Sequence, residues 1–338
     1  MSKDVSVALV GAGRIARVHA AAYERVHGGR LTACTDPVTA AADALAEDFS
    51  LKVAPDLDAL LADDTIDAVL VASPNALHPD QTIAALEAGK HVFCQKPIAL
   101  TLSEADRVVA HAADRPQILQ HGFMLRFTPP MAQLRQQLAS GALGDPVAAQ
   151  AAVFGWEPTN EWFYDPAKGG GVILDTLVHF GELILWLFGP AQSVHTEGGA
   201  YVLDGAKRYN SPDNATVLIK HTNGAVSSLY VSWTAGHGNF TVDVYGTEGR
   251  LGVDLVQSQT MRAFRTPRAV AASGGASGWA FPDLVWDYGY TGEQQYFVDR
   301  VAGRADGSAA ATPAEARDAL ALVLAAQRSL DEKRTVTL

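Results

Sequence analysis

The feature that most constrains this chain is a glycine turn close to its start. A short apolar stretch, residues 7–10, runs directly into Gly11-Ala12-Gly13-Arg14-Ile15-Ala16, and a helix-forming sequence follows. In this spacing Gly11 permits a tight turn, Gly13 lets the backbone approach a pyrophosphate, and Ala16 lets the helix pack against the strand. Arg14 and Ile15 open that helix, where unpaired amides and the positive dipole end attract phosphates. The motif predicts a dinucleotide site.

A second apolar stretch supports this prediction. Residues 31–35 end in Asp36, where a carboxylate would accept hydrogen bonds from the adenosine ribose hydroxyls. The same carboxylate would repel a 2′-phosphate, and the residues that follow, Pro37-Val38-Thr39-Ala40, contain no Arg or Lys to pair with one. We therefore expect NAD rather than NADP.

The pattern of apolar residues divides the chain into two domains, residues 1–122 and 123–338. In the first, short apolar strands alternate with helical stretches, which is typical of a doubly wound parallel sheet. Strands are expected at residues 5–10, 31–35, 68–71, 91–94 and 118–120, and helices at 79–88 and 102–113. In the second, a meander of antiparallel strands is expected at 215–220, 225–231, 240–245 and 251–255, with helices at 130–140, 172–188, 293–302 and 313–330. The fold class is α/β.

Composition excludes several classes of protein. The chain has 338 residues, of which 48% are hydrophobic, and 37 acidic residues outnumber 26 basic ones. No basic cluster suggests a nucleic-acid surface, and no apolar run approaches the roughly 18 residues needed to span a bilayer. Two cysteines, Cys34 and Cys94, do not make a disulfide framework in a chain of this length. We expect a cytoplasmic protein with reduced thiols, no metal site, and neither a nucleic-acid nor a membrane partner.

Polar residues with catalytic chemistry follow three predicted elements. Ser73, Asn75 and His78 come after one strand, and Gln95-Lys96-Pro97 comes after another. Loops at the carboxyl edge of a parallel sheet line its ligand crevice. A run of three glycines, 169–171, precedes Asp175 and His179, which lie four residues apart and would share one face of an α-helix.

Alcohol oxidation explains why Lys, Asp and His would act together. A hydroxyl must lose its proton while hydride leaves the same carbon, which requires a base near neutrality and a donor to the developing oxyanion. His179 suits the base, Asp175 can hold its tautomer, and Lys96 can donate to the oxygen. Taken singly, Lys96 is equally well explained as a surface lysine, Asp175 as a helix cap and His179 as a half-buried histidine. Their occurrence with the glycine motif favours a site, whereas His19, His91 and His121 are interpreted as structural.

These residues resemble the family of glucose-fructose oxidoreductase and inositol dehydrogenase over nearly the whole chain. The shared motifs are the glycine turn 11–16, Ser73-Pro74-Asn75 with His78, the segment 88–92, Lys96-Pro97, Gly122-Phe123 with Arg126-Phe127, Gly170-Gly171 before Asp175 and His179, and residues 245–249. The resemblance implies an N-terminal Rossmann domain and a C-terminal α/β domain with a large, mostly antiparallel open sheet, through which the chains form dimers or tetramers. It implies that Lys96, Asp175 and His179 oxidise a hydroxyl of a sugar or polyol, with Ser73, Asn75, His78 and Gln95 beside the cofactor.

Two departures from that pattern stand out. The usual Glu-Lys-Pro is Gln95-Lys96-Pro97 here, and the Asp that often follows the histidine by three residues is Glu182. Because neighbours in an extended segment point to opposite sides, the change at Gln95 should affect Lys96 less than its adjacency suggests.

The candidate substrate residues predict a small neutral polyhydroxylated ring. Trp162 lies in a segment, residues 154–168, that mixes aromatic and polar groups, including Trp156. These aromatics could equally be core or interface residues. Arg126 and Lys168 are the only cations near the predicted site, too few to clamp a phosphate or carboxylate. The loop 266–291 carries several aromatics and is a lid, a subunit contact or an ordinary packed loop.

Two other functions stay open at this point. One is a regulator or sensor that binds the cofactor without catalysis, which the Lys/Asp/His set argues against. The other is a glycosidase that uses NAD as a bound redox partner.

Overall fold

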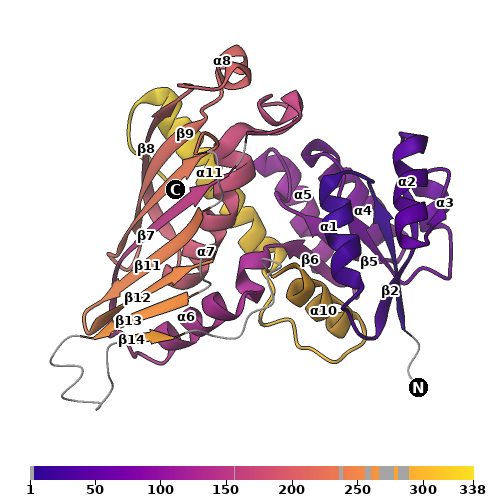
Figure 1. Ribbon diagram of the computed structural model, residues 1–338, viewed down its shortest axis with the longest axis horizontal. Helices are drawn as coiled ribbons and strands as arrows, with labels where there is room; N and C mark the ends of the chain where they lie inside the picture. Colours follow the sequence, from indigo (N-terminus) through magenta and orange to yellow (C-terminus); the bar gives the residue numbers. More distant parts are fainter. Residues whose placement is uncertain (1–3, 156, 236–238, 256–259, 266–277, 281–288) are drawn as a thin grey trace. The chain divides into compact units, whose positions relative to one another are not determined.

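The computed structural model describes residues 4–155, 157–235, 239–255, 260–265, 278–280 and 289–338. The chain forms two compact units. The first consists of Met1–Phe127 and Asp287–Arg317, and the second of Thr128–Trp286 and Asp318–Leu338. Figure 1 labels many of the helices and strands of both units.

The first unit is built on a six-stranded sheet in the order β3-β2-β1-β4-β5-β6, in which every pair of strands is parallel. Its strands are β1 (Val5–Val10), β2 (Gly29–Thr35), β3 (Lys52–Val53), β4 (Ala68–Val71), β5 (His91–Gln95) and β6 (Leu119–Gly122). Its helices are α1 (Arg14–Tyr23), α2 (Thr39–Phe49), α3 (Leu57–Leu61), α4 (His78–Glu87), α5 (Leu102–Ala113) and α10 (Tyr290–Val301), with short 3₁₀ turns η1 (Asn75–Leu77) and η2 (Met124–Phe127).

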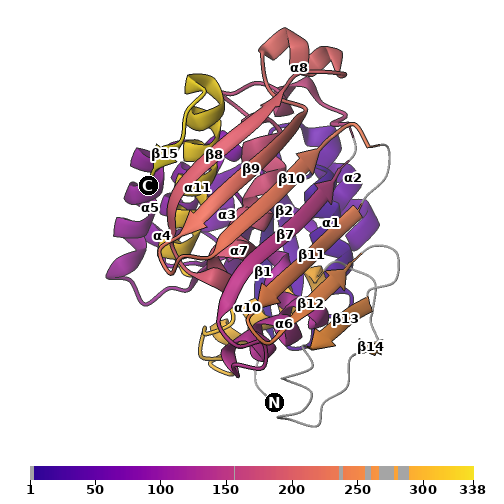
Figure 2. The same ribbon diagram turned by 90° about the vertical axis from the view of Figure 1, so that its left-hand side faces the viewer.

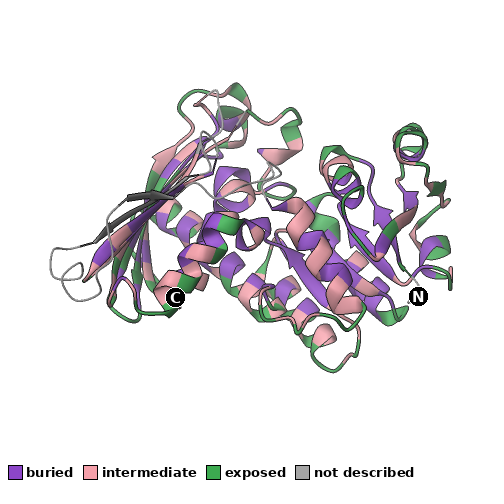
Figure 3. Cartoon of the chain, turned by 60° about the horizontal axis from the view of Figure 1, so that its bottom comes forward, coloured by how far each residue is buried: buried purple, intermediate pink, exposed green. Residues whose placement is uncertain are grey.

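Both faces of this sheet are covered. Every residue of β1, β4 and β6 is buried. In Figure 3 the strands of this sheet are mainly purple, the colour of buried residues. Strands buried on both faces read as continuous apolar runs, which is why the sequence revealed β1 and β4 so clearly. The predicted doubly wound parallel sheet is confirmed.

The first unit also contains a segment from near the end of the chain, Asp287–Arg317. A single domain boundary at residue 122 therefore does not describe the two units. Phe297 and Val298 of α10 are fully buried in the same core as Leu9 and Phe93. A Cβ atom at Gly29 would lie 2.6 Å from Cγ2 of Val298, so β2 and α10 are in close contact. The expected second domain, residues 123–338, therefore includes a helix that packs with the first.

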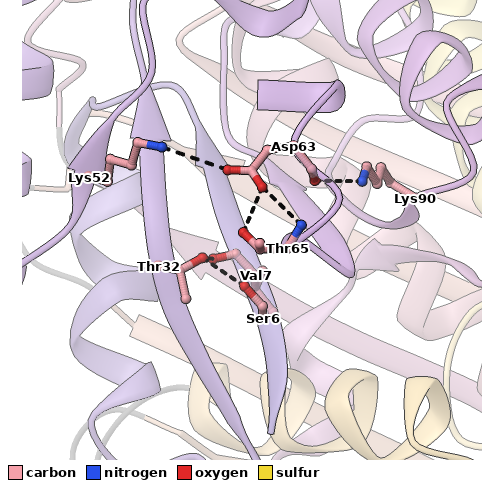
Figure 4. Close-up of polar contacts among 7 residues, drawn as sticks. All are labelled: Ser6, Val7, Thr32, Lys52, Asp63, Thr65 and Lys90. Atoms are coloured by element: carbon pink, nitrogen blue, oxygen red, sulfur yellow. Dashed lines mark hydrogen bonds and ion pairs between the residues drawn. The ribbon is translucent and has the colours of Figure 1, made fainter. Parts of the chain in front are cut away.

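Lys90 explains part of the sequence pattern without any catalytic role. Its buried ammonium group donates to the carbonyl oxygens of Asp63 at 2.8 Å and Ile66 at 2.9 Å, and so holds the turn before β4. Figure 4 shows this turn, where the Asp63 carboxylate accepts from the Thr65 hydroxyl at 2.6 Å. Lys90, the lysine of the 88–92 segment, therefore has a structural role.

The second unit carries a nine-stranded sheet in the order β14-β13-β12-β11-β7-β10-β9-β8-β15. Its strands are β7 (Pro146–Phe154), β8 (Ala191–Gly199), β9 (Asn214–His221), β10 (Val226–Ser232), β11 (Asn239–Gly246), β12 (Gly249–Asp254), β13 (Thr260–Arg265), β14 (Gly278–Ala280) and β15 (Val336–Thr337). Its helices are α6 (Pro129–Ala139), α7 (Val178–Phe188) and α8 (Asp204–Tyr209), a 3₁₀ turn η3 (Glu161–Phe163), a π-helical turn η4 (Ile173–Leu177), and most of α11 (Pro313–Glu332).

The predicted meander is only partly correct. The hairpins β9–β10 and β11–β12 are antiparallel as expected, but β7 lies between β10 and β11 and pairs in parallel with β10. β7 is rich in alanine and comes long before its partners in the chain, so neither its apolar pattern nor a turn signal announced this pairing.

One face of this sheet packs on helices and the other carries exposed apolar side chains. In Figure 2 the strands face the viewer and α6 and α7 lie behind them. Along β9, buried and exposed residues alternate, with Val217 and Ile219 buried and Leu218 exposed. The large apolar side chains exposed on β7, β9 and β10 are Val147, Leu218, Val226 and Tyr230.

None of the helices in the described part of the chain is both long and apolar enough to cross a membrane.

Candidate active site

The glycine turn adopts the geometry that the motif predicts. Gly11 has a φ of +101°, and a Cβ atom there would lie 2.7 Å from the carbonyl oxygen of Ala72, so a side chain is excluded both by conformation and by space. A Cβ atom at Gly13 would meet no described atom within 4 Å. Glycine at position 13 is therefore not explained by the protein's own packing, which fits the close approach of a pyrophosphate. Ala16, in the first turn of α1, is fully buried.

Asp36 connects the glycine turn to the start of α2. One carboxylate oxygen accepts from the amide of Ala12 and the other from the amide of Val38, each at 2.8 Å. The carboxylate is thereby held at the carboxyl end of β2, where a ribose would be bound. Arg14 is exposed, and Ile15 packs against the core, so Ile15 can offer a ligand only its backbone.

His78 joins two of the predicted cofactor loops. It is buried, with Nδ1 2.8 Å from the carbonyl oxygen of Pro97 and Nε2 2.9 Å from that of Ser73. Burial lowers its pKa, although both carbonyls favour the charged form. The ring therefore ties the loop after β4 to the loop after β5. Asn75 is also buried, and the Ser73 hydroxyl contacts the amide oxygen of Gln81.

Gln95 is held by a histidine that the sequence marked only as structural. His19 is fully buried, with Nε2 against the amide of Gln95 and Nδ1 3.1 Å from the amide nitrogen of Gln294. Burial lowers the pKa of His19 to about 3, so the ring is neutral and donates at only one nitrogen. One of the two amides therefore turns its oxygen to the ring. A Cβ atom at Gly122 would lie 2.9 Å from Nε2 of Gln95, which confines the amide from the other side.

Lys96 and Arg126 also belong to the first unit. Lys96 is half-buried and follows β5 directly, with a cis peptide bond to Pro97. The Arg126 side chain is buried and pairs with Glu315 at 3.2 Å. Burial alone would raise the pKa of Glu315, but hydrogen bonds from Thr312 and the charge of Arg126 hold this pKa below its usual value. Arg126 thus anchors the start of α11.

Asp175 and His179 belong to the second unit and lie on two kinds of helix. Asp175 is in the π-helical turn η4, and His179 is the second residue of α7. The single α-helix expected at 172–188 is therefore π-helical at residues 173–177 and α-helical from Val178 on. Both side chains are half-buried. π-helical turns are rare and occur frequently at functional sites. Gly171, with a φ of +72°, leaves no room for a side chain because a Cβ atom would lie 2.1 Å from the Ser211 hydroxyl.

Two residues that contact each other at this turn, Trp233 and Thr176, were not predicted from the sequence. The indole of Trp233 donates to the hydroxyl of Thr176 at 2.8 Å, and that hydroxyl lies 3.4 Å from Oδ2 of Asp175. Trp233 and Thr176 are 57 positions apart, so no local pattern links them. For His19, in contrast, a signal existed: it lies one turn after Ala16 on the buried face of α1.

The remaining predicted substrate residue, Trp162, is half-buried and stacks on Phe163 with ring centroids 3.8 Å apart. Trp156 and most of the loop 266–291 lie outside the described residues. Of that loop's aromatics, Tyr290 packs edge-on against His19, at 5.3 Å between ring centroids. Cys34 and Cys94 are free and buried. Among the described residues, no group of three or more His, Cys, Asp or Glu is arranged to hold a metal ion.

Comparison with known proteins identifies the family. Residues 5–123 match the model of an oxidoreductase family with an NAD-binding Rossmann fold, and residues 131–252 match the GFO/IDH/MocA C-terminal domain. The chain belongs to the GFO/IDH/MocA family of oxidoreductases. The resemblance inferred from the motifs is thereby confirmed, as are the α/β fold class, the NAD cofactor and the assignment to the oxidoreductases.

Several proteins are similar to this chain over most of their length. A myo-inositol 2-dehydrogenase of Thermotoga maritima is 27% identical over 98% of each chain. A 1,5-anhydro-D-fructose reductase of Ensifer adhaerens is 30% identical over 72% of this chain and 74% of the relative. Among solved structures, GenD2 from gentamicin A biosynthesis, in complex with NAD, has a TM-score of 0.86 at 30% identity, covering 100% of this chain and 97% of the other.

Proposed function

We propose that this oxidoreductase is an NAD-dependent dehydrogenase that oxidises a secondary or anomeric hydroxyl of a neutral monosaccharide or cyclic polyol. The observation that carries the proposal is the pair Asp175 and His179, half-buried at the junction of η4 and α7. Relatives named as inositol 2-dehydrogenases and an anhydrofructose reductase support the substrate class.

Each member of the Lys/Asp/His set has a separate task in this proposal. His179 takes the hydroxyl proton, and Asp175 keeps the imidazole in the tautomer that can accept it. Lys96 donates a hydrogen bond to the same oxygen and stabilises its developing negative charge. When bound by the first unit, NAD would supply the hydride acceptor for the carbon that carries the hydroxyl. The reaction thus moves one proton to the protein and one hydride to the cofactor.

The cofactor residues fit NAD in the first unit. Backbone at Gly11 and Gly13 and the first amides of α1, at Arg14 and Ile15, would hold the pyrophosphate, and Asp36 would hold the adenosine ribose. Ser73, Asn75 and Gln95 lie at the carboxyl ends of β4 and β5, the edge where the rest of a dinucleotide is bound. His78 serves this site by lying between the Ser73 and Pro97 carbonyls, to one of which its neutral ring donates a hydrogen bond.

A neutral substrate fits the charges around the candidate residues. Arg126 is buried against Glu315, so a substrate carboxylate or phosphate would compete with an acid already paired to it. Trp162 supplies flat apolar surface for the C–H face of a sugar ring.

A substrate screen tests the proposal. Purified enzyme would be mixed with NAD or NADP and a panel of inositols and neutral sugars, and the absorbance of reduced nicotinamide followed. We expect reduction with at least one neutral polyol and a higher kcat/KM with NAD than with NADP. A preference for phosphorylated or acidic sugars, or for NADP, contradicts the corresponding part of the proposal.

Reactions without net oxidation are a second candidate. A relative of Mediterraneibacter gnavus, 27% identical over 75% of this chain, is named 2,7-anhydro-N-acetylneuraminate hydratase. Such a reaction, or the glycosidase that sequence reasoning left open, would consume substrate while added NAD stays oxidised. Cofactor binding with no substrate turnover at all would instead favour a sensor.

We further propose that the exposed sheet face binds a second copy of this chain, giving a dimer or tetramer. Leu218 on β9 is 49% exposed, Val226 and Tyr230 on β10 are 38% and 37% exposed, and the pairing of the two strands puts all three on this face. An exposed apolar patch of this kind marks a surface for contact with another protein. Light scattering should show a mass at least twice that of one chain, and Leu218→Glu should reduce this mass. A monomeric wild type would contradict the proposal.

Two buried free thiols fit a cytoplasmic location.

A further inference from the structure

A buried tryptophan and a threonine support the Asp175 carboxylate. We propose that Trp233 and Thr176 are positioning residues that fix the rotation of this carboxylate for the dehydrogenase reaction. This inference rests on the proposed function, because it assigns a purpose to the orientation of Asp175.

The direction of the hydrogen bonds follows from the chemistry of the groups. An indole N–H can only donate, so the Thr176 hydroxyl accepts from Trp233 Nε1 at 2.8 Å. With that position taken, the hydroxyl proton is available to another acceptor, and Oδ2 of Asp175 lies 3.4 Å away. Threonine in a helical segment divides between two χ1 rotamers, and the hydrogen bond from Trp233 favours the one seen here. The two side chains form a donor chain that ends on one oxygen of the carboxylate.

Trp233 is itself held from three sides. Its side chain is buried, and its ring packs edge-on against Tyr164, with centroids 5.5 Å apart and an interplanar angle of 87°. Its amide donates to the carbonyl oxygen of Asp213 at 2.9 Å. A Cβ atom at Gly155 would lie 3.2 Å from Cδ1 of the indole, so glycine there gives the ring its space.

Asp213, which accepts the hydrogen bond from the Trp233 amide, is itself fixed by the segment 201–203. Its buried carboxylate accepts from the amides of Tyr201, Val202 and Leu203 at 2.8–3.0 Å. Burial alone would raise its pKa, but these hydrogen bonds hold it below the usual value, so the carboxylate is charged at neutral pH. The segment that presents Trp233 is thus fixed before any substrate arrives, as a positioning role requires.

Substitutions at Thr176 separate the hydroxyl from the shape of the side chain. Thr176→Val keeps the shape and loses the hydroxyl, whereas Thr176→Ser keeps the hydroxyl and loses a methyl group. We expect kcat to fall roughly tenfold in Thr176→Val and to stay within about threefold of wild type in Thr176→Ser, with the dissociation constant of NAD unchanged in both. Thr196→Val is the matched control, because Thr196 is buried in the same unit and its hydroxyl has no hydrogen-bond partner among the described residues.

A double variant tests whether Trp233 acts through Thr176. Trp233→Phe should lower kcat several-fold, and the variant that combines it with Thr176→Val should be no slower than Thr176→Val alone. Additive losses would mean that the two residues act separately and would overturn the chain. Thermal unfolding of every variant accompanies the kinetics, since a purely structural role predicts that activity follows stability rather than the hydroxyl.

The outcomes distinguish this inference from the proposed function. If the wild type oxidises a polyol and Asp175→Asn is impaired while Thr176→Val is as active as wild type, the positioning role alone is wrong. If the wild type oxidises no polyol, both fail.

Discussion

The two units of this chain carry their functional residues in different ways. In the first unit, nearly every candidate residue follows a buried parallel strand directly: Asp36 after β2, Ser73 after β4, and Lys96 after β5. In the second, Asp175 lies in a π-helical turn that is supported by a tryptophan 57 positions from its neighbour Thr176. The first unit places its residues by local connection, whereas the second does so by contacts between distant segments.

This difference matches the tasks that we assign to the units. Pyrophosphate and ribose are bound largely by backbone amides and a fixed carboxylate, which a strand and a turn can supply. Proton transfer requires a side chain at one distance and angle, and such positioning needs support from several directions. Variants in the first unit should therefore change cofactor affinity most, and variants in the second should change the chemical step.

The largest expected effect is on kcat, from a substitution in the second unit, and it tests whether that unit carries the chemical step. His179→Asn should lose roughly 10²–10⁴-fold in kcat, because it removes a positioned proton-transfer group. The dissociation constant of NAD, measured by fluorescence titration, should change little. Near-normal turnover at saturating substrate, with folding verified, would show that His179 is not the base. Lys96→Met should be similarly slow, which makes Lys96 the one residue of the first unit placed in the chemistry.

An intermediate effect is expected at the glycine turn. Gly11→Ala places a Cβ atom 2.7 Å from the Ala72 carbonyl at a φ of +101°, and strain of about 1–3 kcal/mol corresponds to roughly 5- to 150-fold in binding if NAD requires this turn. Calorimetric titration should show weaker NAD binding, while the kcat reached at saturating NAD stays close to wild type. The matched substitution Gly13→Ala has no such overlap within the protein, so a loss of NAD affinity there would come from contact with the cofactor itself.

The smallest expected effect concerns acid stability. Burial lowers the pKa of both His19 and His121 in the first unit to about 3, whereas in the unfolded chain each is near its ordinary value of 6.5. The folded state therefore binds fewer protons than the unfolded state between these values, and stability falls as pH drops below about 6.5. Each histidine adds about 1.4 kcal/mol per pH unit to this loss.

Urea unfolding at pH 7.5 and pH 5.5 measures that slope. His121→Leu removes one of the buried titrating rings and should make the loss of stability on acidification smaller. An unchanged slope in this variant would mean that His121 is already protonated in the folded protein or does not titrate in this range.

The contrast between the units also explains what the sequence could reveal. The Rossmann sheet, the glycine turn and Asp36 were predictable because each depends on neighbours within one strand–turn–helix unit. The place of β7, the return of α10 to the first unit and the π-helical turn were not, since each depends on which distant segments pack together. His19 illustrates the limit within the first unit: its burial was predictable, but its contact with Gln95 requires the tertiary structure.

One measurement tests the central claim most directly: the fate of hydrogen from the substrate carbon. A polyol that is oxidised in the screen would be labelled with deuterium on the reacting carbon and incubated with enzyme and NAD, and the reduced nicotinamide analysed by mass spectrometry. We predict one deuterium in each reduced cofactor, with the rate of its appearance lowered in His179→Asn. Reduced cofactor without deuterium, or product formed while NAD stays oxidised, would contradict the assignment of this chain as a polyol dehydrogenase.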